Sequence, residues 1–241
     1  MRAALRILGL ALLLLACVPP HLLSKALYGR STWPYRFLRL AAAIAGAKVR
    51  VVGPKPKPYS LLIANHISWL DILVLSSATG CAFVSKDKLG SRLIHWLADQ
   101  NHTIYVDRSA RRQVGSQVAT IREALGRRLP VAIFPEGTVG PGDELLPFRS
   151  TLLAAVAPGP EGTHVQPVAI DYGAAATELS WHGEQAIPNA LRILGRRGTF
   201  PVTVRLLEQL PASNDRKAIA ALAQERIGAS LAASSSNTHP L

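Results

Sequence analysis

The chain of 241 residues is poor in cysteine and in charge. Its two cysteines, Cys17 and Cys81, are too few for a disulfide framework or a thiolate metal site, which favours an intracellular protein. Charged residues make up 17% of the sequence, below the roughly 25% usual in soluble proteins, while hydrophobic residues reach 49%. This balance is typical of a protein that is partly embedded at an interface.

Acidic residues are absent from the first 60 positions, where ten Lys or Arg carry most of the net charge of +12. Apolar and aromatic residues run through this basic segment, including the stretch Ile7–Val18. Such a mixture fits an anionic membrane surface better than a nucleic acid, so we expect no nucleic-acid partner. Residues 1–47 are therefore predicted to be a membrane-contacting helical anchor. A span needs about 20 apolar residues, whereas the uninterrupted run has twelve, which favours anchoring over crossing.

From Lys48 onward, short apolar runs alternate with amphipathic segments, the pattern of an α/β domain. The candidate strands are Lys48–Val52, Tyr59–Ala64, Cys81–Val84, Thr103–Val106, Val131–Phe134, Val165–Ile170 and Val202–Leu206. The candidate helices are Leu70–Ser77, Ser91–Asp99, Gln113–Arg127, Leu145–Val156, Ala186–Leu194 and Asp215–Leu231. We expect one α/β domain over 48–227, with a mixed, mostly parallel central sheet flanked by helices. A Ser/Ala-rich disordered tail is expected over 228–241.

An imidazole and a carboxylate follow the second apolar run at a spacing of five positions, in Asn65-His66-Ile67-Ser68-Trp69-Leu70-Asp71. His66 falls where the strand opens into a loop, and Asp71 falls in the first turn of the next helix. A neutral His is a good general base when its second ring nitrogen donates to a carboxylate. The alternative is that both residues merely satisfy the ends of a strand and a helix.

Two further polar segments also follow apolar runs. Asp107-Arg108 ends the fourth run, and a guanidinium is suited to a forked grip on phosphate or carboxylate. The loop Phe134-Pro135-Glu136-Gly137-Thr138 ends the fifth, where Pro fixes the exit and Gly permits close backbone approach to a ligand. Taken singly, these segments could be an ordinary surface ion pair and a tight turn. Because loops at the carboxyl ends of strands converge, we expect all three segments at one crevice.

Together, in this order, the three segments resemble the glycerolipid acyltransferase family, from about Lys48 to Leu210 and with a fourth element at Val165–Ile170. The resemblance implies a membrane-associated enzyme that moves a fatty acyl group from acyl-CoA or acyl-carrier protein to the free hydroxyl of a lysolipid. His66 would be the general base and Asp71 its orienting acid. It implies no metal and no organic cofactor, and a place at the cytoplasmic face of the bacterial inner membrane.

By the same resemblance, the acceptor's head group would be bound by Arg108, Glu136, Gly137, Thr138 and Arg149. The chain departs from members that act on lysophosphatidic acid, because Val139-Gly140 follow Thr138 where a basic residue is common. That change looks like the branch of lyso-ornithine lipid acyltransferases, whose acceptor has no phosphate. Two arginines could still grip a phosphate, so 1-acylglycerol-3-phosphate, giving phosphatidic acid, is the favoured acceptor, with lyso-ornithine lipid as the alternative.

Two other classes of function stay open. Leu14-Leu15-Ala16-Cys17 is close to a lipoprotein cleavage box, so the protein could be an exported, lipid-anchored lysolipid-binding protein. Pro19-Pro20 and the continuing basic, apolar sequence favour a retained segment instead. A hydrolase that uses His66 and Asp71 to activate water would release free fatty acid. No Gly-x-Ser-x-Gly sequence is present to supply a serine nucleophile.

Overall fold

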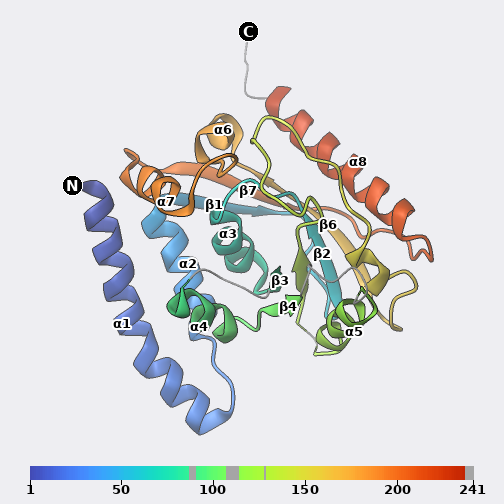
Figure 1. Ribbon diagram of the computed structural model, residues 1–241, viewed down its shortest axis with the longest axis horizontal. Helices are drawn as coiled ribbons and strands as arrows, with labels where there is room; N and C mark the ends of the chain where they lie inside the picture. The colour runs from blue at the N-terminus through green and yellow to red at the C-terminus, as the bar shows by residue number, and fades with distance from the viewer. Residues whose placement is uncertain (87–90, 107–113, 128, 237–241) are drawn as a thin grey trace.

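The centre of the protein is a seven-stranded sheet, seen in a computed structural model that describes residues 1–86, 91–106, 114–127 and 129–236 (Figure 1). The strand order is β1-β7-β6-β2-β5-β3-β4. The strands are β1 (Ala47–Val52), β2 (Ser60–Ala64), β3 (Ala82–Lys86), β4 (Ile104–Val106), β5 (Val131–Ile133), β6 (His164–Asp171) and β7 (Phe200–Leu206). All seven expected strands are present, with ends that shift by a residue or two.

Every neighbouring pair of strands is parallel except β6 and β7, which run antiparallel. The prediction of a mixed, mostly parallel sheet is therefore confirmed. β2 lies between β6 and β5, and all five of its residues are buried. A continuous apolar run of this kind is typical of a parallel strand that is covered on both faces.

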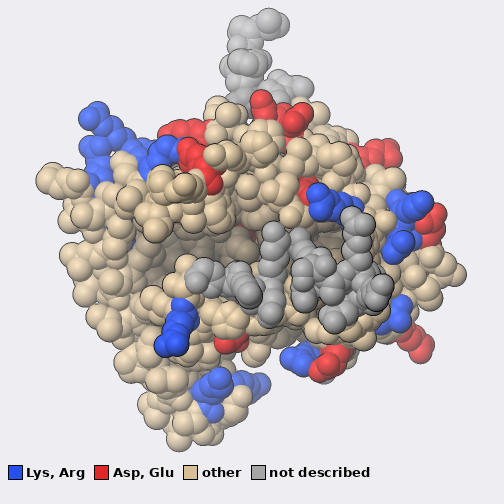
Figure 2. All heavy atoms as spheres, viewed as in Figure 1, with Lys and Arg blue, Asp and Glu red and all other residues tan. Residues whose placement is uncertain are grey.

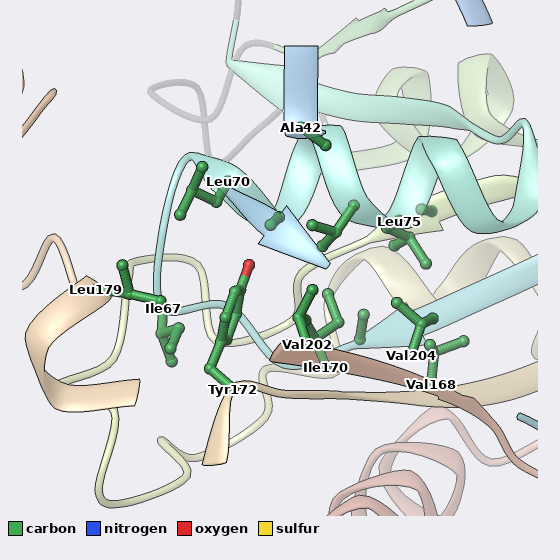
Figure 3. Packing of buried hydrophobic residues seen from close by; sticks show 14 of the residues in the cluster. Ala42, Ile67, Leu70, Leu75, Val168, Ile170, Tyr172, Leu179, Val202 and Val204 are labelled. Atoms are coloured by element: carbon green, nitrogen blue, oxygen red, sulfur yellow. The ribbon is translucent and has the colours of Figure 1, made fainter. Parts of the chain in front are cut away.

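Helices cover the two faces of this sheet (Figure 1). They are α1 (Arg2–Tyr28), α2 (Trp33–Ala45), α3 (Leu70–Thr79), α4 (Arg92–Gln100), α5 (Val114–Leu125), η2 (Leu152–Ala155), η3 (Gly173–Ala175), α6 (Ala176–Leu179), α7 (Ala186–Gly195) and α8 (Arg216–Ser236). Because side chains alternate along a strand, Leu62 and Ala64 of β2 join a core with α2, α3 and α7. Leu61 and Ile63 join the opposite core with α5 and α8. Figure 3 shows part of the first core.

The N-terminal segment is one long helix rather than a short apolar run. α1 continues through Pro19 and Pro20 to Tyr28, and its length and composition are sufficient to cross a membrane. It packs against α2 and α7. Its Arg6 donates to the carbonyl oxygens of Ile193 and Leu194 in the last turn of α7, and to that of Gly198 beyond the helix. The helix is thereby fixed to the domain that follows it.

Two sequence predictions about the C-terminal half were wrong. The expected helix over Leu145–Val156 is a loop that ends in the short 3-10 helix η2. Pro147 has no N–H, and the N–H of Phe148 donates to the side chain of Gln224 on α8, so these groups are not available for a helical ladder. The tail expected from Gly228 is instead helical as far as Ser236, because α8 packs Ile227 and Leu231 against the sheet. Residues 237–241 lie outside the described part.

Gly53, directly after β1, lies very close to the backbone at the end of β7. Its φ is +98°, and a Cβ there would lie 1.9 Å from the carbonyl oxygen of Leu206. Gly162 also has a positive φ, +76°, with nothing within 4 Å of a Cβ. Gly162→Ala should cost roughly 1–2 kcal/mol of unfolding free energy from its backbone conformation alone. Gly53→Ala should cost roughly 2–3 kcal/mol more, because of the clash. Urea unfolding in detergent, followed by circular dichroism, measures both; equal losses would contradict the close contact.

Candidate active site

The candidate base lies in the loop that follows β2, at the centre of the sheet. Asn65 fixes the start of this loop, since its side-chain amide donates to the carbonyl oxygen of Ile170 at 3.0 Å. Its Oδ1 accepts the N–H of Ile170 at 2.7 Å. This pair of bonds continues the pairing of β2 with β6 beyond the last residue of the strand. His66 therefore leaves the sheet from a fixed backbone position.

His66 and Asp71 meet as the sequence predicts. His66 Nδ1 lies 2.8 Å from Asp71 Oδ2, and the carboxylate is fully buried in the first turn of α3. The same oxygen accepts the N–H groups of Ile67 and Ser68, at 2.8 and 2.9 Å. These donors supply hydrogen bonds that replace the hydration of the buried carboxylate. With Nδ1 directed at the carboxylate, Nε2 is the ring nitrogen that a reacting group can approach.

Tyr172 is a fourth donor to this carboxylate, and the sequence analysis did not identify it. Its hydroxyl donates to Asp71 Oδ1 at 2.7 Å. Figure 3 shows the ring rising from the end of β6 with its oxygen directed toward the start of α3. Burial raises the pKa of Tyr172 well above its usual range, and the charge of Asp71 adds to the shift. The hydroxyl therefore stays protonated and donates. The only sequence signal was an aromatic residue two positions after the sixth apolar run, Val165–Ile170.

The imidazole is partly accessible. The His66 side chain is 18% exposed, and its ring stacks on Phe134 with the ring centres 4.2 Å apart. Phe134 follows β5. The His66 ring is therefore held by two contacts, a hydrogen bond to the Asp71 carboxylate and the aromatic face of Phe134. The face of the molecule in Figure 2 is hollowed at its centre, over α3. A base that is both oriented and reachable is the arrangement needed to remove a proton from a bound molecule.

The loop after β5 touches the backbone of His66. Glu136 is 2% exposed, and its Oε1 accepts the N–H of His66 at 2.7 Å. Burial raises the pKa of this carboxyl group to about 7, against the lowering effect of the N–H donors of His66 and Leu146. Farther along, the N–H of Gly140 donates to the carbonyl oxygen of His66 at 2.7 Å. The two loops predicted to converge therefore do so.

Three other predicted head-group residues, Gly137, Thr138 and Arg149, lie within or beside this loop. Gly137 is half-buried and Thr138 is exposed. A Cβ on Gly137 would lie 3.3 Å from a guanidinium nitrogen of Arg149, which is exposed, so the arginine reaches the outer side of the loop. Arg108 and its neighbour Asp107 follow β4 and lie outside the described residues.

A third segment, 180–182, packs against both loops. The N–H of Trp181 donates to the carbonyl oxygen of Ile67 at 2.8 Å, and the Ser180 hydroxyl donates to that of Gly140 at 2.8 Å. The Nδ1 of His182 lies 3.0 Å from the carbonyl oxygen of Val139. These contacts place the segment at the side of the site, next to both loops. Within the described ranges, no group of three His, Cys, Asp or Glu is placed to hold a metal ion.

Comparison with known proteins identifies the family of this chain. Residues 48–171 match the acyltransferase family. The chain is 34% identical to the lyso-ornithine lipid O-acyltransferase of Pseudomonas aeruginosa, over 92% of this chain and 89% of that protein. It is also 34% identical to the enzyme of that name from Rhizobium meliloti, over 80% and 73%. It is 29% identical to a 1-acyl-sn-glycerol-3-phosphate acyltransferase of Neisseria gonorrhoeae, over 80% and 77%.

The same fold occurs in a solved structure. The crystal structure of the 1-acyl-sn-glycerophosphate acyltransferase of Thermotoga maritima superimposes with a TM-score of 0.58 at 22% identity. The match covers 95% of this chain and 97% of that chain, so it includes the N-terminal helices.

The buried Glu136 carboxyl group should make folding stability depend on pH. Its pKa of about 7 in the folded protein exceeds the value of 4.5 expected for an unfolded chain. Between these values the folded state binds more protons, so the unfolding free energy falls as pH rises, by up to about 2.5 kcal/mol between pH 5 and 8. In Glu136→Gln this contribution disappears. Urea unfolding at both pH values should show a smaller decline in the variant than in the wild type, and equal declines would contradict the buried acid.

Proposed function

The chain belongs to the acyltransferase family, and from this premise we propose that it transfers a fatty acyl group from a thioester donor to the free hydroxyl of a lysolipid, with His66 as general base. The donor would be acyl-CoA or acyl-carrier protein. The observation that carries the proposal is the partly exposed imidazole held on a buried carboxylate, between the loops that follow β2 and β5. Membership of an enzyme family also favours catalysis over the carrier role left open by the sequence.

The geometry supports one order of reaction steps. His66 Nε2 accepts the proton of the lipid hydroxyl as its oxygen attacks the thioester carbonyl carbon. Asp71 stabilises the imidazolium that forms, through the 2.8 Å contact with Nδ1. The tetrahedral intermediate then expels the thiolate, which takes the proton from the imidazolium. The new ester bond replaces the thioester bond, and no acyl-enzyme is needed.

The acceptor best supported is a lyso-ornithine lipid. The relatives from Rhizobium meliloti and Pseudomonas aeruginosa carry that name, and the second matches nearly the whole of this chain. The loop after Thr138 continues with Val139 and Gly140, without the basic residue that would face a phosphate. These observations reverse the preference for a phosphate-bearing acceptor that the sequence alone suggested. Gly137, Thr138 and the Arg149 guanidinium are the described groups proposed to hold the head group.

A second candidate acceptor is 1-acylglycerol-3-phosphate. The relative from Neisseria gonorrhoeae is named for that reaction. Arg149 carries a permanent charge at the mouth of the site, and a guanidinium binds phosphate and carboxylate by the same forked geometry. A panel of acceptors distinguishes the two possibilities.

The first 47 residues are proposed to bring the site to the membrane, at the cytoplasmic face of the inner membrane. α1 exposes a row of large apolar side chains, among them Leu8, Leu12, Leu15 and Leu23, each more than half exposed. In Figure 2 the side of the molecule formed by α1 is nearly free of charge, while Lys and Arg gather near its two ends. Apolar side chains flanked by cations are suited to an anionic bilayer surface.

The decisive experiment supplies the purified protein with labelled acyl thioester and a panel of lysolipids. We expect acylated lyso-ornithine lipid as the main product, with less phosphatidic acid. His66→Ala should lower the rate by at least about 10³-fold, because the base is lost. His164→Ala serves as the control, since His164 lies at the start of β6, opposite the end that leads to Tyr172, and pairs with the first residue of β2; it should leave the rate within about twofold. Activity of His66→Ala near that of the wild type would refute the base, and free fatty acid as the main product would indicate a hydrolase.

Arg149→Ala tests the head-group contact. We expect the acceptor KM to rise by roughly tenfold or more, because an exposed charge-assisted contact with an anionic group is lost. The KM for the thioester donor should stay within about twofold. Initial-rate measurements with each substrate varied in turn give both constants. Equal changes in the two constants would remove Arg149 from the acceptor site.

A further inference from the structure

Glu136 faces the main chain of the candidate base rather than the mouth of the site. The family resemblance assigns this residue to the acceptor, yet its side chain is almost completely buried. Oε1 accepts the N–H of His66 at 2.7 Å, and Oε2 accepts the N–H of Leu146 at 3.4 Å. Both carboxyl oxygens are therefore directed at backbone donors inside the protein, where a lipid hydroxyl does not reach them.

The loop that carries Glu136 holds His66 at both of its backbone polar groups. The side chain of Glu136 takes the N–H, and the N–H of Gly140 donates to the carbonyl oxygen at 2.7 Å. Gly140 makes this closure possible, because a Cβ at that position would lie 3.1 Å from Glu136 Oε2 and 3.5 Å from the His66 carbonyl oxygen. The result is a clasp, formed by Glu136 and Gly140, around one residue.

The clasp satisfies a backbone donor that the strand ladder leaves without a partner. His66 comes two residues after the end of β2, so its N–H has no partner in the strand ladder. A partly buried N–H without an acceptor is costly. Oε1 of the Glu136 carboxyl group supplies that acceptor at 2.7 Å and at a fixed place. Since the imidazole is also tied to Asp71 and stacked on Phe134, the backbone bond completes the set of contacts that determine where Nε2 lies.

We propose that Glu136 is a positioning residue, which fixes the backbone of His66 by accepting its N–H and does not bind the acceptor. The proposal rests on the proposed function, in which His66 is the base. The proposal gives Glu136 and Arg149 different roles, although the family resemblance assigns both residues to the head group of the acceptor.

The kinetic test compares Glu136→Ala, Glu136→Gln and Arg149→Ala. A shift of about 1 Å in a reacting group can cost about 10²-fold in rate, so Glu136→Ala should lose about that factor in kcat. Its acceptor KM should stay within about threefold of the wild type. Glu136→Gln keeps an oxygen for the His66 N–H, and its kcat should stay within about tenfold. Arg149→Ala should show the opposite division, with the acceptor KM raised more than kcat is lowered.

A second readout does not depend on acyl transfer. In Glu136→Ala the His66 amide loses its acceptor, so hydrogen exchange of the peptide that spans residues 65–68 should quicken. Gln166→Ala is the matched structural control, because Gln166 is also a fully buried polar residue and donates to the carbonyl oxygens of Pro54 and Leu207. It should lower stability without changing the exchange of residues 65–68 or the kcat of the folded fraction. If Glu136→Ala does not fold, Glu136→Gln carries the exchange measurement, with a smaller increase expected.

The outcomes separate this proposal from the proposed function. A tenfold rise in acceptor KM with kcat retained in Glu136→Gln would make Glu136 an acceptor ligand and overturn the proposal. Unchanged exchange at residues 65–68 in Glu136→Ala would overturn it as well. If the wild type acylates no lysolipid, the proposed function fails, while faster exchange in the variant would still support the clasp.

Discussion

The structure of the site depends on one buried carboxylate. Asp71 is removed from water, and a buried charge is tolerated only where hydrogen bonds replace its hydration. Two backbone N–H groups, the imidazole and the Tyr172 hydroxyl supply them. The donors come from two segments, the loop after β2 and the end of β6, while the carboxylate itself lies in the first turn of α3. The carboxylate therefore orders the segments around it as well as the ring it orients.

Strand order explains why these segments meet. β2 lies between β6 and β5, and all three run parallel, so their carboxyl ends open at the same edge of the sheet. His66 leaves β2, Tyr172 follows β6, and Phe134 and Glu136 follow β5. Residues that follow the two neighbouring strands, β6 and β5, thus lie on either side of the segment that follows β2. The predicted Asp107-Arg108 segment follows β4 in the sequence, and β4 is separated from β5 by β3.

The sequence predicted those features whose signal is local. Seven apolar runs gave the strands, and the spacing of His66 and Asp71 gave their contact, because one short turn joins them. Features that depend on distant partners were missed. Tyr172 reaches Asp71 across 101 positions of sequence, and an aromatic residue near the end of an apolar run does not by itself predict that contact. The helix expected after Leu145 fails for the same reason, since a side chain of α8 takes the N–H of Phe148.

A series of hydrogen bonds connects the N-terminal helix α1 to the site. Arg6 of α1 holds the C-terminal end of α7. Asn189, in the middle of α7, donates to the carbonyl oxygen of Ser180 and accepts from the indole N–H of Trp69 in the loop after His66. Segment 180–182 in turn donates to both loops of the site. A helix with an exposed apolar face is thus joined through α7 to the loops that hold the base. If α1 lies against the bilayer, these hydrogen bonds fix the orientation of the site relative to the lipid surface, because they connect α1 to the site loops through folded segments.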